Sequence, residues 1–211
     1  MNYIYLHGFA SGTQSRKAQY LTDRFAEIGI NLITPDLNLG DFSTITLSKQ
    51  LTFLQDNYGN QPCYVMGSSL GGLLATLWAI VHPGIERLVL LAPAFRFSEC
   101  LQQTIGEQEI EEWKTKGTRN FYHYGFGYEI PLLYEFFLDA TRHDEKKLER
   151  ELPILIIHGK SDDVVLPERS REFAQERPYV DLRLVESDHS LSNIHEYIWQ
   201  ETQKFWQLAK Q

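Results

Sequence analysis

The sequence predicts an α/β protein with a doubly wound sheet of about six parallel strands. Three observations favour this fold class. Short apolar runs alternate with longer amphipathic segments along the 211 residues, which is typical of strand-helix-strand units. The apolar runs have no polar face, as expected of strands that helices cover on both sides. Finally, a Gly-Ser-Ser-Leu-Gly sequence separates one apolar run from a long apolar segment, which indicates a sharp turn from strand to helix.

Each expected strand is short and rich in branched apolar residues. The six strand candidates are residues 3–6, 31–34, 63–66, 88–92, 154–157 and 182–185. Helices are expected between them, because apolar side chains recur there at helical spacing or, in one case, fill the segment almost throughout. The expected helices cover residues 14–28, 44–57, 70–81 and about 192–208.

The stretch between the fourth and fifth expected strands breaks this alternation. It holds about sixty residues, and a connection of that length is usually functional. We expect helices at residues 107–116 and at about 131–141, on either side of a Gly/aromatic segment. The sequence therefore predicts a single domain, residues 1–211, into which a small helical cap, residues 95–151, is inserted.

Composition and charge argue against several classes of protein. The chain is 43% hydrophobic and 23% charged, close to globular averages and unlike disordered or fibrous chains. Its net charge is −8, and no basic stripe occurs, so no nucleic-acid partner is expected. No apolar run approaches 18 residues, so no membrane span is expected. Two cysteines, no metal-ligand spacing and no basic N-terminal leader favour a reducing, cytoplasmic setting and no structural metal.

Ser69 is the candidate nucleophile. It is the central serine of Gly67-Ser68-Ser69-Leu70-Gly71, and only this frame fits the pattern G-x-S-x-G. A tight turn would hold Ser69 in a strained backbone conformation and project its hydroxyl at the helix N-terminus, where free N–H groups favour negative charge. The alternative is a Gly/Ser turn without chemistry.

The loop after the first strand is expected to complete an oxyanion hole. His7-Gly8-Phe9 follows that strand directly, and a loop in this position lies beside the G-x-S-x-G turn when the turn is catalytic. The N–H groups of Phe9 and Leu70 are then the expected donors to a developing oxyanion. We expect His7 to hold the loop through hydrogen bonds, and it is also a candidate for substrate contact.

Asp162 and His189 complete a candidate Ser-His-Asp triad. Asp162 follows the fifth expected strand and His189 follows the sixth, so the chain order is serine, aspartate, histidine. Asp162 would fix the tautomer of the imidazole, and His189 would take the proton of Ser69 and return it to the leaving group. Asp163 and, more weakly, Asp36 are alternatives for the acid.

The inserted segment is the candidate for substrate recognition. Residues 121–137 hold eight aromatic rings in seventeen positions. One interpretation is an apolar acyl or aromatic pocket, and the other is that these rings only pack the cap onto the core. The first predicts a preference for apolar over charged acyl groups, with His123 and Tyr128 as candidates for substrate contact.

These motifs together resemble the α/β-hydrolase superfamily and, within it, the small bacterial esterases of the YqiA/YcfP type. The resemblance rests on YLHGF with SRKAQYL, on VMGSSLGG, on HGKSDDVV and on SDHSL, and it covers residues 1–93 and 153–211. It implies esterase activity on small acyl esters without a metal or organic cofactor, carried by Ser69, Asp162, His189, Phe9 and Leu70. The antiparallel strand pair with which many members begin should be missing, and the insertion is longer and more aromatic than in the compact esterases.

We therefore expect a serine hydrolase that cleaves small carboxylic esters or thioesters through an acyl-enzyme. The same triad would serve a peptidase or an acyltransferase, because the cap selects the leaving group and acceptor. A non-catalytic binding protein on this scaffold would usually lack a triad member. A flavodoxin-like nucleotide binder would need a phosphate loop, and neither G-x-G-x-x-G nor G-x-x-x-x-G-K-[ST] occurs. The sequence carries no signal for the oligomeric state.

Overall fold

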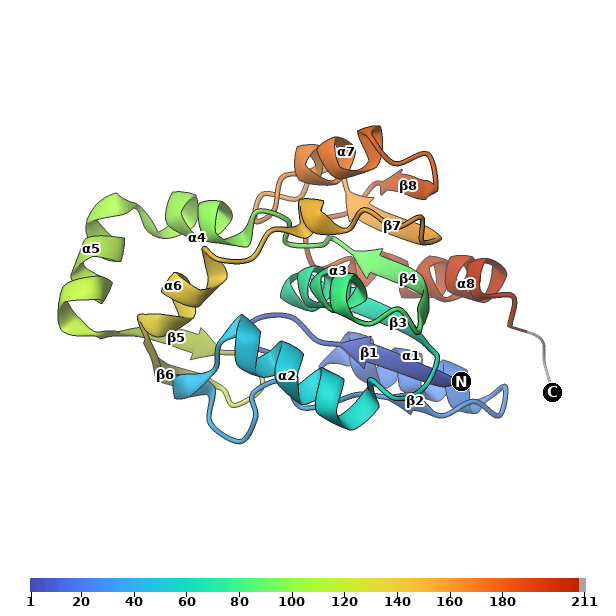
Figure 1. Ribbon diagram of the computed structural model, residues 1–211, viewed down its shortest axis with the longest axis horizontal. Coiled ribbons are helices and arrows are strands. Elements are labelled where there is room, and N and C mark those ends of the chain that lie inside the picture. Colours follow the sequence, from blue (N-terminus) through green and yellow to red (C-terminus); the bar gives the residue numbers. More distant parts are fainter. Residues whose placement is uncertain (209–211) are drawn as a thin grey trace.

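A computed structural model describes residues 1–208, and its centre is a six-stranded sheet (Figure 1). The strand order is β2-β1-β3-β4-β7-β8, and every neighbouring pair is parallel. This confirms the predicted doubly wound α/β fold, and all six expected strands are present. The strands are β1 (Asn2–Leu6), β2 (Leu32–Ile33), β3 (Cys63–Ser68), β4 (Ile85–Leu91), β7 (Ile154–Gly159) and β8 (Val180–Val185).

Helices cover both faces of this sheet. One face packs against α1 (Arg16–Ala26) and α8 (His195–Trp206), and the other packs against α2 (Leu47–Tyr58), α3 (Leu70–Val81) and α7 (Pro167–Gln175). The strands supply both cores because successive side chains point to opposite faces. In β4, for example, Leu88 and Leu90 belong to the core under α2 and α3, whereas Val89 and Leu91 belong to the core under α1 and α8.

The insertion, residues 92–153 between β4 and β7, is only partly helical. It contains α4 (Phe97–Ile105), α5 (Glu107–Lys116), the strands β5 (Thr118–His123) and β6 (Tyr128–Leu133), α6 (Glu135–Ala140) and the 3-10 turn η2 (Glu145–Lys147). The prediction for α5 is confirmed, but the helix expected over 131–141 is shorter, and an antiparallel hairpin that the sequence analysis missed precedes it. Pro131 lies in β6, where a two-stranded sheet tolerates its missing N–H.

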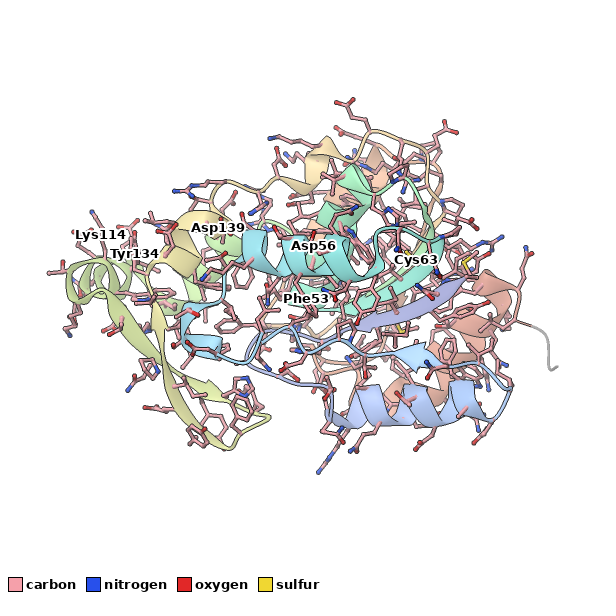
Figure 2. The ribbon with its side chains drawn as sticks, turned by 60° about the horizontal axis from the view of Figure 1, so that its bottom comes forward. Phe53, Asp56, Cys63, Lys114, Tyr134 and Asp139 are labelled. Carbon is pink, nitrogen blue, oxygen red and sulfur yellow. The ribbon has the colours of Figure 1, made fainter. Side chains whose placement is uncertain are left out.

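The insertion leaves the sheet at the end where the strands finish and forms a lobe beyond it (Figure 1). Its two ends meet, because the buried Glu145 carboxylate accepts a hydrogen bond from the Arg96 N–H at 3.1 Å. Asp139 on α6 lies beside the start of α2 (Figure 2). Its carboxylate accepts from the N–H of Ser48 and so caps this helix. Arg150 donates to the carbonyl oxygens of Ala79 and His82 at the end of α3 and to that of Ile85 at the start of β4.

The turn from β3 to α3 depends on missing side chains. Ser69 has φ 54° and ψ −119°, a conformation that is strained for a residue with a side chain. A Cβ on Gly67 would lie 2.1 Å from the Gly71 carbonyl oxygen, and one on Gly71 would lie 2.1 Å from the Leu6 carbonyl oxygen at the end of β1. The two glycines therefore let the chain turn tightly and let the turn pack against β1.

We predict that Gly71→Ala lowers the free energy of unfolding by about 1–3 kcal/mol, because the new methyl group meets the β1 backbone and one of the two segments must move. Gly12→Ala is the matched control, since its Cβ would have no neighbour nearer than 4.0 Å; it should change stability by less than about 0.5 kcal/mol. Urea unfolding measures both variants. Equal stabilities would contradict this account of the turn.

Candidate active site

Ser69 lies between β3 and α3 with its hydroxyl free of any capping role. It occupies the N-cap position of α3, yet its side chain makes no capping hydrogen bond. The backbone holds the residue instead, because its N–H donates to the Leu91 carbonyl at 2.9 Å and its carbonyl accepts from the N–H groups of Gly72 and Ala94. The half-buried hydroxyl is thus available to another side chain.

That other side chain is His189, four residues after β8. The distance from His189 Nε2 to Ser69 Oγ is 3.0 Å, and the distance from His189 Nδ1 to Asp162 Oδ2 is 2.7 Å. Because the carboxylate only accepts, Nδ1 carries the proton and Nε2 is left to accept from the serine hydroxyl. The structure therefore brings Ser69, His189 and Asp162 together from the ends of three strands.

Asp162 is a buried carboxylate with donors on both oxygens. Oδ1 accepts from the N–H groups of Val164 and Val165 at 3.0 and 2.8 Å, and Oδ2 accepts from His158 as well as from His189. Burial on its own raises the pKa of Asp162, but the hydrogen bonds from His158 and His189 outweigh it and hold the pKa well below its ordinary value. The group is thus an anion at neutral pH.

The alternative acids lie elsewhere. Asp163 is exposed to solvent beside Asp162. Asp36 is also exposed and accepts hydrogen bonds from the backbone and side chain of Asn38, so it shapes its own turn. Neither residue forms a hydrogen bond to His189 within residues 1–208.

His158 is a residue of this site that the sequence analysis missed. Its ring is fully buried, with Nε2 3.0 Å from Asp162 Oδ2 and 2.9 Å from the Val165 carbonyl oxygen, and Nδ1 2.7 Å from Ser170 Oγ. Both Nε2 partners only accept, so the proton is on Nε2. His158 therefore holds the loop that carries Asp162. The sequence signal for His158 was its position at the end of a strand, four residues before Asp162.

Lys17 is a second residue that was missed. It lies on α1, and its Nζ donates to Ser68 Oγ at 2.9 Å, next to the nucleophile candidate. Burial lowers the pKa of Lys17 to about 8, against the opposing effect of the Asp188 and Asp162 charges. The Lys17 amino group thus lies beside the turn at Ser69, within reach of the charges of Asp162 and Asp188. The only sequence signal was its place within SRKAQYL.

The loop after β1 lies against Ser69. A Cβ on Gly8 would be 3.3 Å from Ser69 Cβ and 3.9 Å from Ser69 Oγ. Within residues 1–208, neither the Phe9 N–H nor the Leu70 N–H donates a hydrogen bond. His7 Nδ1 bonds to the Gly8 carbonyl and His7 Nε2 accepts from the Leu37 N–H, so both ring nitrogens hold the loop and neither is left for a substrate.

The two cap residues singled out in the sequence have different surroundings. His123 is fully buried, with Nε2 3.1 Å from Asn38 Oδ1 and its ring stacked on Phe126. Tyr128 is 59% exposed on the hairpin, where its ring stacks near Phe126. Among the described residues, no hydrogen bond or ring contact joins either side chain to Ser69, Asp162 or His189.

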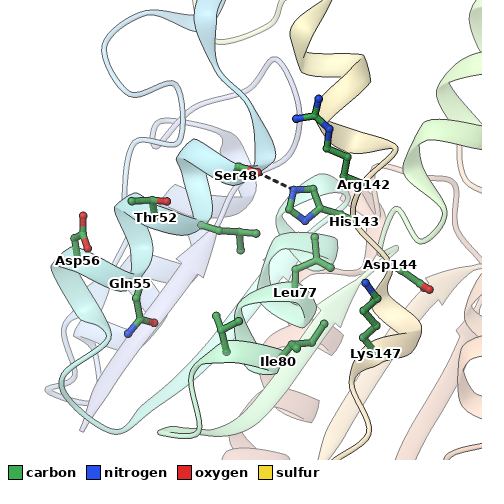
Figure 3. Close-up of a pocket in the computed structure, with 12 residues that line it drawn as sticks. Ser48, Thr52, Gln55, Asp56, Leu77, Ile80, Arg142, His143, Asp144 and Lys147 are labelled. Atoms are coloured by element: carbon green, nitrogen blue, oxygen red, sulfur yellow. Dashed lines mark hydrogen bonds between the residues drawn. The ribbon is translucent and has the colours of Figure 1, made fainter.

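Ser48 and His143 line a groove of about 450 Å³ between α2, α3 and residues 142–147 (Figure 3), and with the buried Asp139 they form a second Ser, His and Asp cluster. Here His143 uses one nitrogen, Nε2, toward both Ser48 Oγ at 3.1 Å and Asp139 Oδ2 at 3.4 Å. The Ser48 hydroxyl is itself only 2.6 Å from Asp139 Oδ1. No imidazole relays a proton between serine and acid, so this cluster is a helix cap and not a triad.

Between residues 1 and 208, no helix has both the length and the apolar character needed to cross a bilayer. The same residues contain no group of three or more His, Cys, Asp or Glu side chains arranged to hold a metal ion.

Comparisons with known proteins agree with this fold. The mitochondrial palmitoyl-protein thioesterase ABHD10 of Rattus norvegicus is 27% identical over an alignment that covers 91% of this chain and 71% of the relative. The structure of mouse alpha/beta hydrolase domain-containing protein 10 superposes with a TM-score of 0.77 at 24% identity, covering 99% of this chain and 90% of that one. Est1E of Butyrivibrio proteoclasticus, solved with ferulic acid bound, gives 0.81 at 22% identity, covering 97% and 87%.

A family assignment follows from the sequence model described as "Uncharacterised protein family (UPF0227)", which matches residues 2–206. The match includes every strand of the sheet, the insertion and the segments that carry Ser69, Asp162 and His189. The chain therefore belongs to the UPF0227 family and has an α/β-hydrolase fold.

Proposed function

We propose that this protein is a serine hydrolase of carboxylic esters or thioesters. The observation that carries the proposal is the chain of hydrogen bonds from Asp162 through His189 to Ser69, 2.7 and 3.0 Å long. These are the distances at which a base activates a nucleophile and a carboxylate orients the base. The names of similar proteins, a palmitoyl-protein thioesterase and the Pyrococcus furiosus esterase Pf2001, support ester or thioester substrates.

In this mechanism, Ser69 Oγ attacks the acyl carbon while His189 Nε2 takes its proton. Asp162, ionised and hydrogen-bonded to Nδ1, stabilises the imidazolium that forms. The N–H groups of Phe9 and Leu70 donate to the oxyanion, and the imidazolium then gives its proton to the leaving group. Water, deprotonated by His189, attacks the acyl-enzyme and releases the acid together with Ser69.

An aromatic cluster next to the Phe9 amide is the proposed acyl site. The Phe9 ring is surrounded by four rings, at centroid distances of 5.4 Å for Phe42, 6.1 Å for Phe97, 5.3 Å for Phe121 and 5.3 Å for Phe136. Three of these four come from the insertion. We therefore propose that the insertion acts as a cap and that partly exposed rings of this cluster bind the apolar part of the substrate.

Chemical labelling should identify the nucleophile. A fluorophosphonate should label the wild type and Ser68→Ala, but not Ser69→Ala, because only Ser69 is hydrogen-bonded to His189. Turnover of an ester should fall by about 10⁴-fold or more in His189→Ala and by about 10⁴-fold in Asp162→Asn, which leaves the wrong tautomer. Mass spectrometry locates the label and initial rates give kcat. Labelling that survives Ser69→Ala would refute the assignment.

The charge of Asp162 should make the stability of the protein depend on pH. Its pKa in the folded protein lies below the unfolded value of about 3.9, so the unfolded chain binds the extra proton. The ionised carboxylate therefore stabilises the fold above about pH 4, and this stabilisation disappears as the pH falls toward the folded-state pKa.

Chemical unfolding at a series of pH values tests this. Stability should fall less steeply below about pH 4 in Asp162→Asn than in the wild type. Asp163→Asn, which changes the exposed neighbour, should keep the wild-type slope. The interpretation fails if Asp162→Asn and the wild type have the same dependence on pH.

The aromatic cluster should give the enzyme a preference for apolar acyl groups. Across p-nitrophenyl esters of increasing chain length, kcat/KM should rise by up to about fourfold per methylene group until the aromatic cluster is filled, since burial of each methylene contributes about 0.8 kcal/mol. A hemisuccinate ester of similar length, which carries a carboxylate, should react more slowly. A preference for the charged acyl group would show that the cluster only packs the insertion onto the core.

A further inference from the structure

The loop that carries Phe9 is strained directly after that residue. Ala10 has φ 50°, which lies in the left-handed region that residues with a Cβ avoid. Ala10 is also 97% buried, since only 3% of its surface is exposed, so solvent does not hold its backbone. Such strain persists only when surrounding groups hold the backbone, so contacts in the fold must fix the chain directly after Phe9.

Two hydrogen bonds hold the carbonyl groups that follow Phe9. The Ala10 carbonyl accepts from the Tyr124 N–H at 2.8 Å, and the Ser11 carbonyl accepts from Asn38 Nδ2 at 3.0 Å. Tyr124 lies at the tip of the β5–β6 hairpin, and Asn38 lies in the loop after β2. The hairpin of the insertion is thus bonded directly to the loop that carries the proposed oxyanion donor.

His123 donates to the side chain of Asn38. The Asn38 amide nitrogen donates to the Ser11 carbonyl and to Asp36 Oδ1, so the amide oxygen faces His123 Nε2 at 3.1 Å and accepts a hydrogen bond from it. His123 Nδ1 then accepts from the Phe126 N–H at 3.2 Å. Burial lowers the pKa of His123, which agrees with a neutral ring that has its proton on Nε2.

We propose that His123 and Asn38, together with the Tyr124 N–H, form a latch that positions the Phe9 N–H in the oxyanion hole. His123 and Asn38 are then positioning residues: they act through the loop and touch neither substrate nor reacting atoms. The inference rests on the proposed function, because it concerns the transition state of that reaction. It assigns the hairpin a role in rate as well as in substrate binding.

The latch predicts a specific kinetic pattern. In His123→Leu and Asn38→Leu the Phe9 N–H should lose its alignment, so kcat should fall by about 10²-fold, as when one oxyanion donor is removed. KM should stay within about twofold, because the ground-state carbonyl depends little on the hole. The affinity for a trifluoromethyl ketone, whose adduct with Ser69 carries an oxyanion, should fall by the same factor as kcat.

Matched variants separate the latch from general damage. His123→Gln retains an N–H donor toward Asn38 and should restore most of the rate. Tyr122→Ala removes a side chain of the same hairpin that is 50% exposed and has no part in the latch, so it should behave as the wild type. The double variant His123→Leu with Asn38→Leu should lose no more than either single variant, because both act through one loop. Rates are expressed per Ser69 titrated with fluorophosphonate, so that unfolded protein does not count.

Several results would overturn the latch. These are a wild-type kcat in both leucine variants, an equal loss in Tyr122→Ala, no rescue by His123→Gln, a multiplicative loss in the double variant, or a change in KM without a change in ketone affinity. A wild type that neither turns over esters nor labels at Ser69 would remove the proposed function and the latch together. An active, labelled wild type with unaffected leucine variants would remove the latch alone.

Discussion

The close contact between the end of β1 and the turn at Ser69 is the constraint on which the rest of the site depends. Gly71 lies so near the Leu6 carbonyl that even a methyl group would collide with it. This contact presses the loop that carries Phe9 against the nucleophile candidate and lets Ser69 adopt φ 54°. Backbone geometry thus places the loop after β1 against Ser69 before any side chain contributes.

Hydrogen bonds to an ionised carboxylate then link the loops after β7 and β8 to Ser69. A buried carboxylate is costly unless donors surround it, and Asp162 has backbone donors on one oxygen and two imidazoles on the other. His158 holds the Asp162 carboxylate through a hydrogen bond, and His189 links that carboxylate to Ser69. On the opposite side, the hairpin of the insertion contributes the contacts that hold the loop after Phe9. The sheet and the loop of Asp162 thus meet at Ser69, and the insertion bonds to the neighbouring loop.

The fold was predictable because its signals are local: apolar runs mark the strands, and the Gly-Ser-Ser-Leu-Gly turn marks the transition from β3 to α3. The hairpin was missed because its Gly/aromatic segment and Pro131 resemble a loop followed by a helix, and only packing against the core makes them strands. His158 and Lys17 were missed because their partners come from folding, across loops and helices. Ser69, Asp162 and His189 were named from motif order and lie within hydrogen-bond distance, but their catalytic roles stay predictions.

We propose above all that Ser69 attacks the acyl carbon and that the N–H groups of Phe9 and Leu70 hold the oxyanion that forms on the substrate. A crystal structure of the protein after reaction with a fluorophosphonate tests it most directly, because phosphorus takes the place of the tetrahedral carbon. We expect phosphorus bonded to Ser69 Oγ and its oxygen about 2.7–3.1 Å from the nitrogens of Phe9 and Leu70. An adduct on another residue, or an oxygen that points away from both nitrogens, would contradict the account.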